Sequence, residues 1–176
     1  MKTPLMERLG NGIDRAAAHA LYLLLKPMKQ RYKSVTLNSA GLVIKAGGSA
    51  LAKTGGSITH YMANGKSGQI AAATDMPALV GTVLTDTCNV FVFTVDSAGT
   101  KYAQMGTAAA TEANVVWPTL DPERAIIGFI KCNPVGTGSF VGGTTALDDA
   151  TVFTSAAAEL LYVSPVGMFD PTATID

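Results

Sequence analysis

The segment Cys88–Val95 (CNVFVFTV) constrains the fold most, because it is apolar on both sides of an extended chain. Successive side chains of a β-strand point to opposite faces of the sheet. One face would then carry Val90, Val92 and Thr94, and the other would carry Phe91, Phe93 and Val95. A strand that is apolar on both faces is typical of a sheet covered on both sides. The sequence therefore predicts that Cys88–Val95 is a central, buried strand.

The segments around this strand predict its neighbours. Asp96–Gly99 suits a four-residue turn with its glycine in the left-handed region, and Thr100–Met105 would return as the hairpin partner. Ala125–Cys132 (AIIGFIKC) is a second strand with two apolar faces. Gly128 in its middle indicates a bulge or a close packing contact.

Short apolar runs separated by turn residues continue from residue 34 onward. Val35–Asn38 and Leu42–Ala46 predict a hairpin around Ser39-Ala40-Gly41, and Ser57–Met62 and Gln69–Ala73 flank a turn cluster at Asn64–Gly68. Shorter candidates are Leu79–Leu84, Ser139–Val141, Thr151–Thr154 and Leu160–Val163. About ten short strands at this spacing predict a mainly β fold, a sandwich or barrel of short antiparallel strands.

Residues 1–33 differ from this pattern and predict an N-terminal α-helical arm. Ile13–Leu25 is rich in Ala and Leu, and Pro27 would end or kink the helix. A heptad stripe is formed by Leu9, Ile13, Ala16, Ala20 and Leu23. It suits either an ordinary amphipathic helix or a self-associating bundle. The expected organisation is the arm at 1–33, a β-rich body at 34–163 and an extended C-terminal tail at 164–176.

Charge separates the arm from the body. Residues 1–33 hold seven basic and two acidic residues, whereas the remainder holds six basic and eleven acidic residues. The arm could therefore meet an acidic surface on a partner protein, a neighbouring copy or nucleic acid, or it could be a solvated terminus. The predicted partner-binding residues of the arm are Leu9, Ile13, Leu21, Leu24, Lys26, Lys29, Arg31 and Lys33. Its apolar run Ala16–Leu25 is too short for a membrane span, which takes about 20 residues.

Catalytic equipment is sparse in the sequence. The two histidines, His19 and His60, belong to no metal or nucleophile motif, and the adjacent Asp148 and Asp149 would point to opposite faces of a strand. None of the glycine pairs completes a phosphate-binding pattern. Cys88 and Cys132 lack metal-ligand spacing, so we expect reduced thiols that pack as small hydrophobes, with a disulfide as the alternative. The expectation is a protein that is not an enzyme, with no catalytic residue, metal, cofactor or small-molecule substrate, and without a nucleic-acid or membrane partner.

Only 15% of the residues are charged, against about 25% in an ordinary soluble domain. Two causes suit this deficit: surface buried against other chains, and surface covered by Ser, Thr, Gly and Ala. Both favour a structural protein that assembles with other chains. A small hydrolase or lyase on a β scaffold is a third reading, but the sequence offers it no acid, base or metal set.

The order of three segments resembles a class of small structural proteins of tailed bacteriophages. The segments are FVFTVDSAGTKYAQMG (Phe91–Gly106), PERAIIGFIKC (Pro122–Cys132) and SFVGGTTALDDATV (Ser139–Val152). The class includes capsid decoration (cement) proteins and fibre-like head and tail components, and the resemblance covers roughly residues 60–155. It implies a virion protein on the capsid surface, present in many copies and often as a homotrimer.

This resemblance yields two functional expectations. The first is a decoration protein that binds the major capsid protein and stabilises the contacts between its subunits. Under this expectation, deleting residues 1–33 would leave a folded body that no longer binds capsids. The alternative is a head or tail fibre or adhesin subunit that binds a host receptor or glycan.

Overall fold

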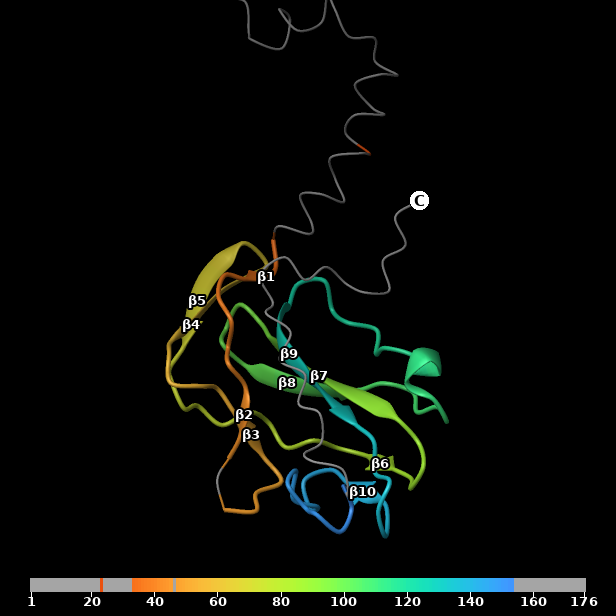
Figure 1. Ribbon diagram of the computed structural model, residues 1–176. Coiled ribbons are helices and arrows are strands. Elements are labelled where there is room, and N and C mark those ends of the chain that lie inside the picture. Colours follow the sequence, from red (N-terminus) through yellow and green to blue (C-terminus); the bar gives the residue numbers. More distant parts are fainter. Residues whose placement is uncertain (1–22, 24–32, 46, 154–176) are drawn as a thin grey trace, which may run out of the picture. The chain divides into compact units, whose positions relative to one another are not determined.

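The computed structural model describes Leu23, residues 33–45 and residues 47–153 (Figure 1). The chain divides into two compact units, Met1–Tyr32 and Lys33–Asp176, and the fold described below is that of the second. Of the predicted helix Ile13–Leu25, only Leu23 is described, as an exposed helical residue. The rest of the predicted arm, the strand candidate Leu160–Val163 and the tail 164–176 lie outside the described residues.

The described body is mainly β and antiparallel, as the sequence predicts. Its strands are β1 (Val35–Thr36), β2 (Val43–Ile44), β3 (Ala52–Lys53), β4 (Thr59–Ala63), β5 (Lys66–Ile70), β6 (Thr82–Val83), β7 (Asn89–Val95), β8 (Lys101–Met105), β9 (Ala125–Cys132) and β10 (Phe140–Val141). They form two three-stranded sheets, β1-β4-β5 and β8-β7-β9, and two two-stranded ribbons, β2-β3 and β10-β6. A short 3₁₀ helix, η1 (Glu112–Asn114), lies between β8 and β9.

Strand β7 confirms the central prediction, since it lies between β8 and β9 and every one of its residues is buried. Its Phe91 and Phe93 face the main core, where the Phe91 ring packs edge-on against Phe140 at 5.9 Å between centroids. On the opposite face, Val90 and Val92 pack in a smaller core with Phe129, Val115, Trp117, Leu120 and Ile126. Both faces of β7 are therefore covered, the second one by residues of the segment between β8 and β9.

The glycine in β9 produces both features that its position predicted. Phe93 pairs with Gly128 and Thr94 with Ile126, so Ile127 is the extra residue of a β-bulge. A Cβ at position 128 would lie 2.7 Å from Cδ1 of Leu42. Because a carbon cannot approach that closely, the absent side chain is what lets Leu42 pack against the bulge.

The first predicted hairpin is wrong. Strand β1 pairs with β4 and β2 pairs with β3, so Val35–Asn38 and Leu42–Ala46 are not partners. Between them Ser39 and Gly41 are exposed, but Ala40 is buried and its carbonyl accepts a hydrogen bond from the amide of Gly55. A distant segment has thus replaced the local pairing.

The second predicted hairpin is confirmed with a tighter turn. Strands β4 and β5 are joined by Asn64 and Gly65 alone, which have φ of 48° and 76°. Positive φ at both central residues is the type I′ geometry that Asn-Gly favours. Lys66–Gly68, expected in the turn cluster, instead belong to the strand.

Thr151–Thr154 was expected to be a strand, but its described residues 151–153 form a turn whose backbone is hydrogen-bonded to residues 136–137. The amides of Gly136 and Thr137 donate to the carbonyls of Val152 and Thr151, at 2.9 and 2.7 Å. Val152 and Phe153 are buried in the main core. Backbone hydrogen bonds to residues 136–137 and burial of Val152 and Phe153 thus hold this segment in place.

Candidate interaction surface

The structure places only Lys33 of the predicted partner-binding arm. Its side chain is exposed, and its backbone carbonyl accepts a hydrogen bond of 2.8 Å from the amide of Gly65. The other predicted arm residues, Leu9, Ile13, Leu21, Leu24, Lys26, Lys29 and Arg31, lie outside the described residues. The arm therefore stays a prediction.

Two of the polar residues that the sequence suggested for chemistry, His60 and Asp149, can be placed in the structure. His60 is exposed on β4. Asp149 accepts hydrogen bonds from the amide and the hydroxyl of Thr151, at 2.9 and 2.6 Å, and the hydroxyl bond is the main cause that lowers the pKa of its carboxyl. Across residues 33–45 and 47–153, no group of three or more His, Cys, Asp or Glu side chains is placed to hold a metal ion.

Both cysteines are free thiols beside one small pocket. The pocket is lined by Cys88, Asn89, Val90, Glu112, Val115, Trp117, Lys131, Cys132 and Asn133. Burial raises the pKa of the Cys132 thiol to about 12, with a smaller contribution from Cys88, and burial also raises the pKa of Cys88. Since the thiolate is the reactive form, these two thiols are poor nucleophiles at neutral pH.

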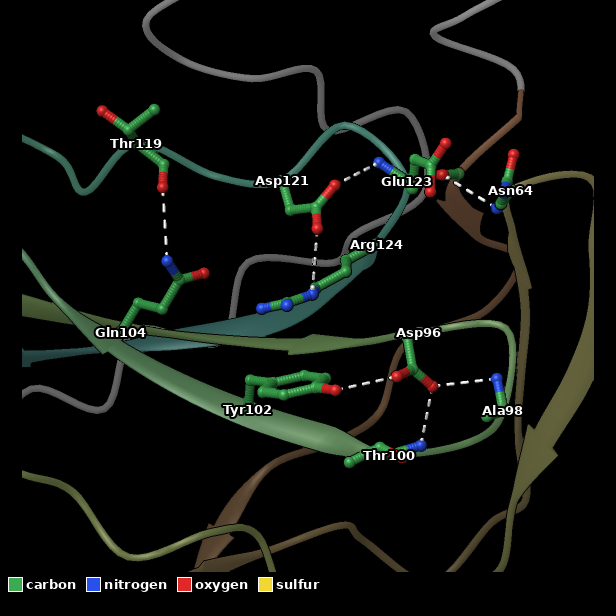
Figure 2. A network of polar contacts seen from close by, with 11 residues as sticks. Asn64, Asp96, Ala98, Thr100, Tyr102, Gln104, Thr119, Asp121, Glu123 and Arg124 are labelled. Atoms are coloured by element: carbon green, nitrogen blue, oxygen red, sulfur yellow. Dashed lines mark hydrogen bonds and ion pairs between the residues drawn. The ribbon is translucent and has the colours of Figure 1, made fainter.

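A polar network secures one end of the β8-β7-β9 sheet (Figure 2). Asp96, directly after β7, accepts hydrogen bonds from the amides of Ala98 and Thr100 and from the Tyr102 hydroxyl, at 2.8 to 2.9 Å. The Tyr102 hydroxyl bond is the main cause that lowers the pKa of Asp96. These bonds close the predicted turn at Asp96–Gly99, where Gly99 has φ of +85°.

The network continues onto the segment that precedes β9. The guanidinium of Arg124 lies over the Tyr102 ring and pairs with Asp121, with 3.3 Å between Nε and Oδ2. Gln104 on β8 donates from its amide to the carbonyl of Thr119 at 3.2 Å. These contacts all join groups of the body itself (Figure 2), and among the described residues only Oε1 of Gln104 in this network is buried without a hydrogen-bond partner, so we interpret the network as structural.

The ribbon of β6 and β10 instead exposes aliphatic side chains. Val83 and Phe140 are Cα partners and are fully buried, whereas the next pair, Thr82 and Val141, is exposed. Four aliphatic side chains on and beside this ribbon have exposed fractions of 74%, 62%, 41% and 41%, and we name them the aliphatic ridge: Val80, Leu84, Val135 and Val141.

Backbone hydrogen bonds connect the chain segments that carry the ridge residues. The amide of Gly142 donates to the carbonyl of Gly81, which joins the chain beside Val141 to the chain beside Val80. The amide of Asp86 donates to the carbonyl of Pro134, the residue before Val135. Exposed aliphatic side chains that gather on one surface are typical of a site that meets another protein.

The amino-acid sequence does not reveal this surface directly. Leu79–Leu84 was expected as a strand, but which of its residues face solvent depends on the partner strand β10, some 60 residues further along the chain. The only available signal was the apolar content of residues 79–84, which suits a buried strand equally well.

Comparisons with known proteins give no relative for this chain. No protein-family model matches it, and neither a curated protein nor a solved structure does. In the described part of the chain, no helix is both long enough and apolar enough to cross a membrane.

Proposed function

We propose that this chain is a structural protein of a tailed-phage virion: a capsid decoration protein that binds the major capsid protein and stabilises the contacts between its subunits. The aliphatic ridge carries the proposal, because it exposes four aliphatic side chains on hydrogen-bonded segments of the body, as a surface that packs against another protein does. The resemblance of residues 60–155 to phage structural proteins supplies the identity of that partner.

The surroundings of the polar residues support a scaffold. Asp96, Arg124 and Asp149 are each engaged by neighbouring groups of the body, and the thiols of Cys88 and Cys132 are held in their protonated form. In the proposed assembly, such a body would contribute its shape and its contact area with other subunits. Its four small sheets act together as one sandwich or barrel, and homotrimers of it would sit on the capsid lattice.

The basic arm has a second role in this proposal. The arm at residues 1–33, with the helix expected at Ile13–Leu25, would dock on a neighbouring capsid or decoration subunit through its apolar stripe and its cluster of lysines and arginines. Many equivalent sites on one shell allow weak contacts by ridge and arm to add up to firm binding.

The test is co-sedimentation of the purified chain with undecorated heads of the phage that encodes it. The double variant Val80→Asp/Leu84→Asp should lose at least about 90% of the bound protein, because two charges would be desolvated at the contact. The control is Val116→Asp, which charges an equally aliphatic residue, 58% exposed, outside the ridge.

The control variant should bind heads as the wild type does. Equal binding by the ridge variant would remove the ridge from the function. Binding of the wild-type chain to host cells or glycans, with no affinity for heads, would instead support the fibre or adhesin alternative.

A further inference from the structure

Strand β5 is an edge strand, and its outer side presents backbone groups that its own sheet does not use. It pairs with β4 alone, at the outer margin of the body (Figure 1). The amide of Leu37 donates to the carbonyl of His60, so His60 and Met62 of β4 bond toward β1. Thr59, Tyr61 and Ala63 therefore bond toward β5, to their partners Ile70, Gly68 and Lys66.

The remaining residues of β5, Ser67 and Gln69, point their amides and carbonyls away from β4. An antiparallel ladder alternates in this way between residues that bond to one neighbour and residues that bond to the other. Among the described residues, no strand pairs with this outer side. Four backbone groups, two N–H and two C=O, are thus available there.

The chain itself limits this open edge at both ends. Beyond Ile70, the carbonyl of Ala71 accepts hydrogen bonds from the hydroxyls of Thr54 and Thr74, at 3.0 and 2.7 Å. Before Lys66, the amide of Gly65 is bonded to the carbonyl of Lys33. The open stretch is therefore Ser67–Gln69, which is long enough to pair with one short strand.

We propose that this edge pairs with the same edge of a second copy, antiparallel, about a two-fold axis at Gly68. In this register Ser67 of each copy lies opposite Gln69 of the other, and each such pair exchanges two backbone hydrogen bonds. All four groups on each copy are satisfied. This inference rests on the proposed function, because it supplies the contact by which neighbouring decoration subunits meet.

Three features of β5 suit a second copy as the occupant. The two-fold register places Lys66 opposite the apolar Ile70, so the two lysines do not face each other. Gly68 lies at the axis without a side chain, because the Tyr61 ring occupies that position: a Cβ there would be 2.4 Å from Cζ of Tyr61. Ser67 and Gln69 are exposed, uncharged and able to pair with each other.

The experiment is sedimentation velocity and equilibrium of the full chain over a wide range of concentrations. The wild type should associate reversibly by pairing, as dimers of the chain or, where the proposed homotrimer forms, as pairs of trimers. Gln69→Pro removes one outward amide without touching the bonds to β4, and proline is tolerated on edge strands. It should halve the mass of the associated species, or raise the dissociation constant at least about tenfold.

Gln69→Ala is the matched control, because it changes the same side chain and keeps the amide; it should associate like the wild type. The register has its own test in two double variants. Ser67→Glu/Gln69→Glu places like charges opposite each other and should weaken association, whereas Ser67→Lys/Gln69→Glu places opposite charges there and should strengthen it. Circular dichroism would establish that each variant is folded.

A wild type that is monomeric at every concentration would overturn the inference. So would Gln69→Pro and Gln69→Ala associating equally, or the two charge variants behaving alike. These results are distinct from a failure of the proposed function, which would appear as a wild-type chain that associates as expected but does not bind heads.

Discussion

The guanidinium carbon of Arg124 lies 3.7 Å from the centroid of the Tyr102 ring. Tyr102 belongs to β8 and Arg124 directly precedes β9, so this stack joins the two strands that flank β7. Asp121 pairs with the same guanidinium and Asp96 with the same phenol. The contact therefore anchors the end of the segment that covers the second face of the sheet.

Replacing Arg124 by alanine should lower the free energy of unfolding by about 1–2 kcal/mol, because the cation–π contact and the ion pair are lost together. Urea denaturation followed by tryptophan fluorescence would measure it. The control is Lys45→Ala, which breaks only the exposed pair of Lys45 with Asp75 and should cost less than about 1 kcal/mol. Equal losses in the two variants would show that the stack adds nothing.

Gly136→Ala should destabilise the body by at least about 2 kcal/mol, because its Cβ would lie 2.1 Å from the backbone carbonyl oxygen of Thr151. The segment that carries Val152 and Phe153 into the core would have to move. Gly56→Ala is the control, since no atom lies within 4 Å of its Cβ and its φ is not in the left-handed region. Thermal unfolding of both variants would measure the difference. A Gly136→Ala protein as stable as Gly56→Ala would contradict the observed packing.

The buried thiol of Cys132 predicts a loss of stability at alkaline pH. Its pKa is about 12 in the folded chain against an ordinary value of 9.0. The unfolded chain therefore loses this proton at a lower pH than the folded chain does. The free energy of unfolding is unaffected by this thiol below pH 9, and it falls as the pH rises from 9 toward 12. The loss is about 1.4 kcal/mol per pH unit within this window.

Urea denaturation at several pH values would compare the wild type with Cys132→Ala. The variant lacks the titrating thiol but keeps the lysines and tyrosines, so its stability should fall less steeply above pH 9. Parallel slopes for the two proteins would contradict the burial of this thiol.

Deleting residues 1–32 should leave a folded body, because Met1–Tyr32 and Lys33–Asp176 are separate compact units. The cut should spare Lys33, whose carbonyl bonds to Gly65 at the β4–β5 turn. We expect an unchanged melting temperature of the body and weaker binding to heads. Unchanged binding would remove the arm from the mechanism, and an unfolded product would contradict the independence of the body.

Much of the central sheet could be predicted because its signals are local. The alternation in Cys88–Val95, the glycine after Asp96 and the glycine within Ala125–Cys132 each specify a strand, a turn or a bulge without reference to distant residues. The Asn64-Gly65 turn is equally local, since the two residues suit positive φ by themselves.

The parts that could not be predicted depend on pairing over long distances. Val35–Asn38 and Leu42–Ala46 have the pattern of a hairpin, yet β1 pairs with β4 and β2 with β3, and Ala40 and Leu42 are buried in the main core. The exposure of Val80 and Leu84 likewise follows from the pairing of β6 with β10. A candidate surface made by such pairings has no signature in a single segment.

We propose that the body binds a phage shell through the aliphatic ridge, and a binding isotherm of the purified chain on undecorated heads would measure this binding. We expect saturable binding by the wild type and by Val116→Asp, and almost no binding by Val80→Asp/Leu84→Asp. An isotherm that is the same for all three proteins, or a wild type that stays in the supernatant, would contradict it.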